Sequence, residues 1–485
     1  MSFDQKEIFN IIYKLARLTQ TEMRVELDAM GAVNVPLDRL YGRHTTRALK
    51  NFTIGGIEDR MPRAIIIALG LIKKAASITN RSFGLEPNVC DAISIAADDV
   101  ISGKLYDEHH FPLGTWQEGA GAHSNMNVNE VVCNRAIQLL RGQIGGHFPV
   151  HPQTHVNLAH SPHDSFSSAI NIAVAMELQK KLFPSILLVI DTLTKKEQLW
   201  RDIIKMGRTH LMDAVPLTLG QEFGGYRQMM DNCSTRLGSA LKHLYQLSLG
   251  GTSVGTGANS PDQFGIKCVG EIAKLTKLPF VCAPNLFEAI GSRDSLVEIH
   301  GELNSIAVST MKIANDIMFM ASGPNCGLGE IELPKNEPGS SIMPGMVNPT
   351  QCEAMLMICA QVMGNQTAVT VGGYNGHFEL NSFMPVIASN VLRSINLLSS
   401  GLKNFSTNCL VGIEPNMKRL EKTLNESLML VAAITNHIGY DRAAEIAKAA
   451  NINGTTVKKE AIRGGIVKED IDMWLNPSNM LGPSE

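Results

Sequence analysis

The chain has 485 residues and a formal net charge of -3; hydrophobic residues make up 44% of it and charged residues 18%. This is the balance of a globular protein with a large core, and it lacks the basic excess that nucleic-acid binding requires. Aromatic residues make up only 5%, which favours packed helices over a β-sandwich, because sheets draw on aromatic and branched side chains.

The first 20 residues form an extension. Its segment Ile8–Leu18 is compatible with an amphipathic helix that carries Lys14 and Arg17. Mitochondrial transit peptides have this basic amphipathic character but are poor in acids, whereas Asp4 and Glu7 are acidic. The composition of the extension therefore leaves open whether it is a leader.

Residues 21–160 have a mixed pattern of turns and short helices, which predicts a first domain. Its longest apolar stretch, Ala64–Ile72, is far shorter than the roughly 20 residues that cross a bilayer. The stretch therefore predicts a buried core helix, and we expect no membrane association.

Residues 161–416 are dominated by long helical patterns, which predict a central bundle domain. The last of these helices contains Met355–Ala360, which is apolar on every side and must be buried on every side. For a soluble chain this predicts a bundle inside an oligomer. Residues 417–485 predict a small helical cap domain. The expected central helices are Ser168–Phe183, a helix that begins after Pro184 and reaches Trp200, Gln221–Leu249, Leu296–Ala321 and Pro349–Gln366.

A distinctive loop precedes the last of these helices. Residues 339–353 read G-S-S-I-M-P-G-M-V-N-P-T-Q-C-E. Asn348 suits the helix N-cap, Pro349 the first helical position, and Gln351 the third position of a capping box. The sequence therefore predicts a glycine-flanked loop with two adjacent serines that runs into a helix start.

Together with four other segments, this loop resembles the class II fumarases of the aspartase/fumarase lyase superfamily. At the position of this loop, the family's motif is G-S-S-x-M-P-x-K-x-N. The resemblance implies an all-α subunit of three domains whose central helices form the core of a tetramer. It also implies reversible hydration of fumarate to L-malate, a step of the tricarboxylic acid cycle, without a cofactor. The other segments are residues 119–130 (GAGAHSNMNVNE), 151–169 (HPQTHVNLAHSPHDSFSSA), 207–222 (GRTHLMDAVPLTLGQE) and 284–289 (PNLFEA).

The resemblance implies a set of retained site residues. Ser340 takes the position of the base that removes a proton beside a carboxylate, and a serine needs strong stabilisation of its alkoxide to do so. His210 is its expected catalytic companion, and Glu353 would orient it or neighbouring groups. The expected substrate-binding residues are Thr209, Asn125, Ser341, Asn348 and Glu353.

The same comparison implies losses. Two positions with small hydroxyl side chains, which bind a substrate carboxylate in the family, are alanine here. The S-S-N-D stretch is interrupted by a proline and a histidine, and three lysines are replaced by apolar residues. The substituted positions are Ala120, Ala122, Leu158, Pro162, His163, Leu286 and Met346.

These losses predict a fumarase-family protein with severely impaired or absent hydratase activity, because the family's task is to hold two carboxylates and stabilise a further negative charge. Two alternatives stay open. The chain could act without catalysis, as an assembly partner of an active paralogue in a mixed tetramer, since sites in this family are built from three chains. It could also be a lyase with a less anionic substrate.

The extension stands where mitochondrial members carry a leader, which favours mitochondria over the cytoplasm.

Three further patterns bear on metal, disulfide and phosphate sites. His151 and His155 have the spacing of a helical metal-ligand pair, but Pro152 argues against a helix there, so we expect no metal site. The nine scattered cysteines also include no C-x-x-C pair, which predicts free thiols. The glycine-rich segment Gly250–Gly257 matches no phosphate-binding motif and predicts a connecting loop.

Overall fold

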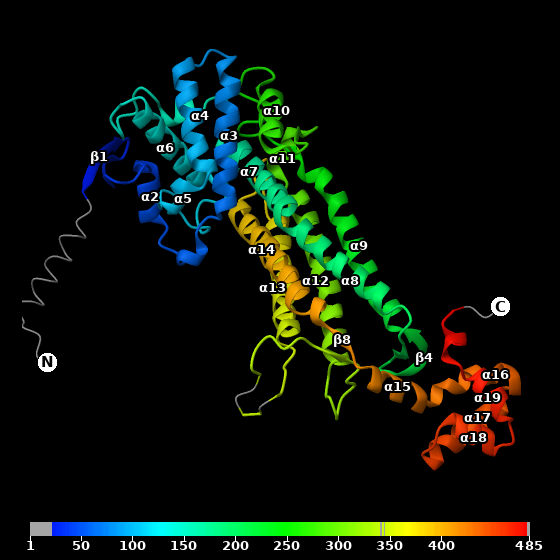
Figure 1. Cartoon of the computed structure of the whole chain (residues 1–485). Helices are drawn as coiled ribbons and strands as arrows, with labels where there is room; N and C mark the ends of the chain where they lie inside the picture. Colours follow the sequence, from blue (N-terminus) through cyan, green and yellow to red (C-terminus); the bar gives the residue numbers. More distant parts are fainter. Residues whose placement is uncertain (1–21, 340–341, 344, 483–485) are drawn as a thin grey trace, which may run out of the picture. The chain divides into compact units, whose positions relative to one another are not determined.

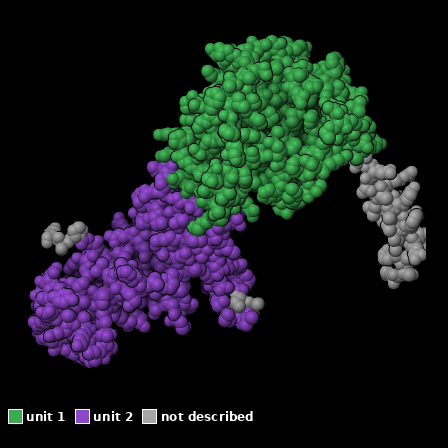
Figure 2. Space-filling view, turned by 180° about the vertical axis from the view of Figure 1, so that it is seen from behind, with its two compact units in different colours: residues 1–180, 237–303, 363–396 green, residues 181–236, 304–362, 397–485 purple. Residues whose placement is uncertain are grey.

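The structure, a computed structural model, describes residues 22–339, 342–343 and 345–482. Helices dominate this part of the chain, and its strands form only four two-stranded sheets (Figure 1). The all-α prediction is therefore confirmed. The chain divides into two compact units, coloured separately in Figure 2: residues 1–180, 237–303 and 363–396 form unit 1, and residues 181–236, 304–362 and 397–485 form unit 2. The three consecutive domains expected from the sequence stay a prediction.

The elements fall into three groups according to the unit that holds their residues. Those of unit 1 are β1 (Met23–Asp28), β2 (Gly31–Pro36), α2 (Arg43–Asn51), α3 (Arg63–Arg81), α4 (Pro87–Ile101), α5 (Lys104–Asp107), α6 (Ala122–Leu139), α7 (Pro162–Glu177), β5 (Gln246–Leu247), α10 (Phe264–Thr276), β6 (Val281–Cys282) and α11 (Leu286–Gly291). Those of unit 2 are α8 (Phe183–Leu199), β3 (Ile204–Thr209), β4 (Met212–Thr218), β7 (Ile331–Glu332), β8 (Glu414–Pro415), α15 (Met417–Glu426), α16 (Val431–Ile438), α17 (Tyr440–Asn453), α18 (Val457–Arg463) and α19 (Lys468–Trp474). Helices with residues in both are α9 (Leu219–Leu244), α12 (Asp294–Met320), α13 (Thr350–Tyr374) and α14 (Met384–Asn408).

The apolar run 64–72 forms the first half of α3, and most of its side chains are buried, as the sequence predicts. The helix packs against α4, α6, α7 and α10. Gly70 allows α4 to come close, because a Cβ there would lie 3.0 Å from a methyl group of Val100. Helix α3 is therefore the central element of unit 1.

Polar contacts link the long helices inside each unit. In unit 1, the His300 ring of α12 bonds Gln366 of α13 at 2.7 Å and Ser394 of α14 at 2.8 Å. In unit 2, the Tyr226 hydroxyl of α9 donates to Asp316 of α12 at 2.9 Å. The long helices thus lie side by side, as Figure 1 shows, with hydrogen bonds that fix their register.

Several predicted helix ends were wrong. Helix α7 begins at Pro162 instead of Ser168, and Pro184 lies in the first turn of α8 instead of before it, where a missing N–H is harmless. Helix α13 begins at Thr350 and extends to Tyr374. The Gln351 side chain, expected in a capping box, accepts a hydrogen bond from Asn404.

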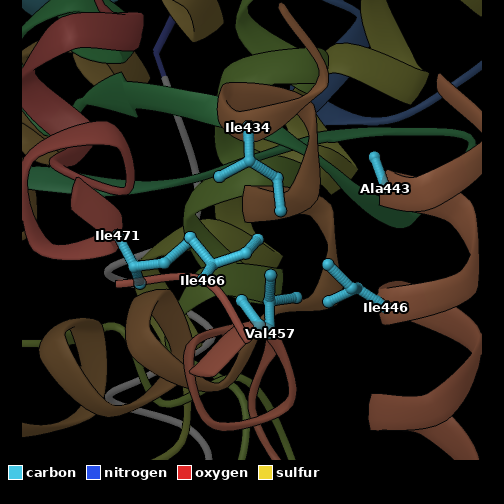
Figure 3. Close-up of a cluster of buried hydrophobic side chains, with 7 residues drawn as sticks. Ile434, Ala443, Ile446, Val457, Ile466 and Ile471 are labelled. Carbon is cyan, nitrogen blue, oxygen red and sulfur yellow. The ribbon is translucent and has the colours of Figure 1, made fainter. Parts of the chain in front are cut away.

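The C-terminal helices α16 to α19 have a small hydrophobic core of their own. Their apolar side chains make a separate core, drawn in Figure 3, in which Ile434 of α16 and Ile471 of α19 are fully buried. Trp474 packs against this core, and its ring stacks on that of His437 with centroids 4.4 Å apart. The members of this core are Ile434, Ala443, Ile446, Val457, Ala461, Ile466 and Ile471.

Unit 2 also contains a buried ion cluster. The Lys205 ammonium contacts Glu330 at 2.8 Å and Glu222 at 2.6 Å, and the side chains of Lys205 and Glu330 are both 0% exposed. Arg208 adds two further hydrogen bonds to Glu330. Burial raises the pKa of Glu330, but the Arg208 bonds and the Lys205 charge outweigh it and hold that pKa below its usual value. The carboxylate is therefore charged and fully paired inside the protein.

Candidate functional site

The start of α7 carries the segment in which the sequence departs most from the fumarase pattern. Ser161 is the N-cap: its hydroxyl accepts from the His163 N–H at 3.1 Å, and the Asp164 carboxylate accepts from the Ser161 N–H at 2.8 Å. Pro162 occupies the first helical position, where a missing N–H costs nothing. Pro162 therefore removes a hydroxyl from the expected site but does not disturb the helix start.

The glycine-rich loop 250–257 is a connecting loop, as predicted, and two of its backbone N–H groups bind the carboxylate of Asp164. The N–H groups of Gly250 and Thr252 donate to the same oxygen of Asp164, at 3.2 Å and 3.0 Å. Burial raises the pKa of Asp164 to about 6, against the lowering effect of these N–H groups. The loop also lies against α11, since a Cβ on Gly251 would come within 3.2 Å of Leu286. It thus joins the α7 start to the segment that carries Leu286.

The start of α6 carries Ala120 and Ala122. Ala120 is fully buried, and Gly121, with φ 73°, turns the chain into the helix. The N–H groups of Ala120 and Ala122 both donate to the Glu118 carboxylate, one to each oxygen, at 3.0 Å. A carboxylate of the protein therefore occupies the donors at this helix start.

Asn125, one of the expected substrate-binding residues, belongs to a buried polar network in unit 1. Its side-chain oxygen accepts from the Lys73 ammonium at 2.7 Å, and its amide donates to Asn157 at 3.2 Å. Lys73 also donates to Asn157 at 2.9 Å and to Nε2 of His160 at 2.9 Å. Because the Leu158 carbonyl accepts from Nδ1 of His160 at 2.8 Å, Nε2 is free to act as an acceptor. All three ammonium protons of Lys73 are therefore used.

Sequence reasoning missed Lys73, which was interpreted only as the end of an apolar run. Its side chain is 0% exposed, whereas the neighbouring Lys74 pairs with Asp98 at 2.7 Å on the surface. The signal was present: Lys73 lies four residues after Leu69, on the buried side of the helix. Burial lowers the pKa of Lys73 to about 7, although Asp164 acts in the opposite direction. Burial and the Lys73 charge in turn hold the pKa of His160 well below its usual value.

The lowered pKa of Lys73 predicts an unusual dependence of stability on pH. Between the folded pKa and the ordinary value near 10.5, the unfolded chain binds the proton that the folded protein has lost, so stability gains from this group as pH rises. Relative to Lys73→Met, the unsubstituted protein should gain about 1 to 2 kcal/mol of unfolding free energy from pH 7 to pH 8.5. Urea denaturation at the two pH values measures this. Lys74→Met should show no such gain, and a flat difference for Lys73→Met would contradict the prediction.

Thr209 and His210 lie in unit 2, at the turn of the β3–β4 hairpin. Thr209 pairs with Met212 across the hairpin, and the two residues between them are both left-handed, with φ 55° at His210 and 62° at Leu211. Two left-handed residues are the geometry of a tight hairpin turn. The side chains of Thr209 and His210 are exposed, so the hairpin presents the expected threonine–histidine pair to the outside of its unit.

The loop before α13 is also in unit 2. Ser340 and Ser341 lie outside the described residues, and their expected roles stay predictions. Met346 is 38% exposed, and its carbonyl oxygen approaches Gly339 so closely that a Cβ there would lie 1.9 Å away. Gly339, with φ 75°, is thus the residue that permits the two ends of the loop to meet.

Asn348 and Glu353 follow this loop. Asn348 lines a cavity of about 210 Å³ together with Glu337 and Thr350, and the Thr350 hydroxyl donates to Glu337 at 2.7 Å. Glu353 is exposed in the first turn of α13. Within the described part of unit 2, no contact joins Glu353 to His210. The orientation of His210 by Glu353, expected from the sequence, is therefore not seen inside a single chain.

The histidines near residue 151 use their ring nitrogens for backbone bonds. Nδ1 of His151 accepts from the N–H groups of Gln153 and Thr154, both at 3.2 Å, and Nδ1 of His155 accepts from the His151 N–H at 3.1 Å. Among the residues with a described placement, no group of three or more histidine, cysteine, aspartate or glutamate side chains could hold a metal ion.

The expected site residues that the structure describes belong to both units, and each unit holds its own set. Unit 1 brings together the starts of α6, α7 and α11, and unit 2 holds the hairpin turn and the start of α13. The positions in unit 1 are Ala120, Ala122, Asn125, Leu158, Pro162, His163 and Leu286, and those in unit 2 are Thr209, His210, Met346, Asn348 and Glu353.

Comparison with known proteins decides the family. Residues 31–364 match a model described as lyase, and residues 430–482 match one described as fumarase C C-terminus. The chain is 53% identical to the mitochondrial fumarate hydratase of Homo sapiens over 466 residues, which are 96% of this chain and 91% of that protein. The chain belongs to the class II fumarase family.

Two further relatives support this assignment across the whole fold. The mitochondrial fumarate hydratase of Rhizopus oryzae is 51% identical over 475 residues, 98% of this chain and 96% of that protein. The crystal structure of a class II fumarase from Schistosoma mansoni superposes with a TM-score of 0.92 at 37% identity, covering 96% of this chain and 100% of that one. The all-α fold and the fumarase assignment expected from the sequence are thus confirmed for this fumarase-family chain.

Proposed function

We propose that this fumarase-family protein hydrates fumarate to L-malate very weakly or not at all. The observation that carries the proposal is the replacement of charged and hydrogen-bonding side chains at several site positions in both units. Leu286 at the start of α11 and the half-exposed Met346 before α13 provide no cation, and Ala120 and Ala122 provide no hydroxyl. Removing one preorganised donor typically costs about 3 kcal/mol of transition-state stabilisation.

The buried lysine does not replace the missing cations. Lys73 is enclosed by Asn125, Asn157 and His160 and has no exposed surface. A substrate carboxylate could reach its ammonium only by breaking that network. Lys73 therefore supports the architecture of unit 1 and does not supply charge to a substrate.

The deciding experiment is a fumarate/L-malate assay on the purified protein beside an intact class II fumarase. Turnover at an ordinary rate with millimolar fumarate would show that another cation has taken over, and the proposal would fail. A rate at least a few hundredfold lower would support it.

We also propose that the protein is a homotetramer, and α13 supports this. Among the described helices, it alone is long and apolar enough to cross a membrane by length and composition. Yet only 28% of its most apolar 18-residue segment is buried within the single chain. An apolar helix of a soluble protein needs partners on its open sides. Other copies of the chain, packed around α13, would provide them.

The mass of one chain is 52.7 kDa, and light scattering should therefore give about four times this mass. Met357, on α13, is 68% exposed, and Met357→Glu should weaken the assembly by placing a charge in the bundle. Met473→Glu is the matched control, because Met473 is 60% exposed on the C-terminal cap. A stable monomer of the unsubstituted protein would contradict the assembly.

A second candidate function uses the same assembly without catalysis. A chain that keeps the helical core but lacks site residues could enter a mixed tetramer with an active paralogue and lower its activity. Co-expression with an active fumarase and isolation through a tag on one chain would reveal mixed tetramers.

Because several relatives are named mitochondrial, we propose a mitochondrial location. Imaging of a tagged full-length chain tests this proposal.

A further inference from the structure

The geometry points to Glu118 as a specificity-determining residue that turns this site away from dicarboxylates and toward a substrate with an uncharged group at the start of α6. The inference rests on the proposed function, because it treats the α6 start as part of the substrate site. It concerns a residue outside the substituted family positions, and it supplies a cause for weak dicarboxylate binding that those substitutions do not.

Glu118 acts as an internal anion at this helix start. Its two oxygens accept from the N–H groups of Ala120 and Ala122, both at 3.0 Å. Its own carbonyl accepts from the Gly121 N–H at 3.0 Å. This is how a bound carboxylate would engage a helix N-terminus, with backbone donors and the helix dipole both favouring negative charge.

The neighbouring Gln117 takes the next donors. Its side-chain oxygen accepts from the N–H and from the hydroxyl of Ser124, each at 3.1 Å. Residues 117 and 118 thus engage the N–H groups at positions 120, 121, 122 and 124. With alanine at 120 and 122, no side-chain hydroxyl is present at these two positions, and the four N–H groups named above are already bound to the chain.

The negative charge of Glu118 is a second obstacle to a substrate carboxylate, beside the N–H donors that are already bound. A substrate carboxylate placed at the α6 start would meet a like charge within a few ångströms and would find its donors taken. An amide or hydroxyl carries no charge, can donate to a Glu118 oxygen, and would be tolerated. The expected ligand therefore keeps the length of a four-carbon dicarboxylate but has one carboxylate replaced by a neutral amide.

Glu118→Gln is the direct test, measured by calorimetric titration with fumarate. The variant keeps the size and one acceptor oxygen of the side chain but removes the charge and releases one N–H donor. Its fumarate affinity should rise about tenfold or more over the unsubstituted protein. An unchanged or weaker fumarate affinity would overturn the inference.

Glu86→Gln is the matched control. Glu86 caps α4 in the same way, accepting from the N–H groups of Asn88 at 3.1 Å and Val89 at 2.9 Å. The two variants lose the same kind of cap, so both should lower thermal stability slightly. Only Glu118→Gln should change fumarate affinity; an equal change in both variants would reduce Glu118 to a helix cap.

A second measurement needs no variant. The unsubstituted protein should bind fumarate monoamide at least severalfold more tightly than fumarate, and this preference should shrink in Glu118→Gln. Tighter binding of fumarate than of the monoamide would contradict the inference even if the variant failed to fold. Ordinary fumarate turnover would overturn the proposed impairment, whereas these affinities test Glu118 separately.

Discussion

Lys205→Met should lower the free energy of unfolding by about 3–5 kcal/mol, the usual cost of removing one partner from a buried ion pair. The substitution keeps the apolar stem but leaves Glu330, which is 0% exposed, without its ammonium partner. Arg208 alone must then balance a carboxylate that has no access to water. Denaturant unfolding at pH 7, with the oligomeric state checked at each step, measures the loss.

The control for this prediction is Lys195→Met. Lys195 pairs with Asp191 at 2.6 Å, but the two side chains are 72% and 57% exposed, and exposed pairs contribute little. Its effect should be at most about 1 kcal/mol. The double variant Lys205→Met with Glu330→Gln should recover part of the stability, since the fully buried carboxylate is then neutral and Arg208, 17% exposed, keeps some access to water. Equal, small losses in Lys205→Met and Lys195→Met would show that the cluster is unimportant for stability.

Restoring one lysine should not restore an enzyme. Met346→Lys returns a charge to the loop before α13, yet the hydroxyls absent at 120, 122 and 162 belong to unit 1, and transition-state stabilisation needs the whole preorganised set. We expect a detectable but partial gain in fumarate turnover. Adding Ala120→Ser, Ala122→Thr, Pro162→Ser and His163→Asn should increase the rate further, by about a hundredfold or more.

The structure makes this combined variant reasonable. Pro162 is the first residue of α7, where serine is accepted, and the cap formed by Ser161 and Asp164 does not depend on it. Steady-state rates with fumarate and with L-malate, on tetramers confirmed by light scattering, give the answer. Full activity from Met346→Lys alone would mean that the other substitutions do not limit the rate and that the missing lysine is the single cause of the low activity.

The sequence predicted the helical class and the long central helices because their apolar patterns are long. It misplaced the start of α7 because the stretch 161–164 was interpreted only as an S-S-N-D site motif altered at Pro162 and His163. Ser161, Pro162 and Asp164 are also a strong helix-start signal. The family assignment came from motifs, and the comparisons confirm it.

The internal charges could not be predicted in the same way. Lys73 is tolerated inside α3 only because Asn125, Asn157 and His160, which follow it by 52, 84 and 87 residues, meet it in space. Glu118 binds two N–H groups only because Gly121 adopts a left-handed conformation at the α6 start. The first depends on tertiary contacts and the second on one local backbone conformation, and neither composition nor local periodicity records them.

The division of unit 1 into three stretches has a consequence for biosynthesis. Its first stretch ends at residue 180 and its last at residue 396, so 216 residues (396 minus 180) must be added before the unit can close. At roughly 5–20 residues per second, translation takes about 10 to 40 s over this interval. The apolar side chains of α3 and α7 lack their partners α10 and α11 until the chain reaches residues 276 and 291, and the last stretch of the unit follows only afterwards. The nascent chain is therefore a natural client for chaperones, and truncation after residue 180 would leave a fragment that cannot complete its own core.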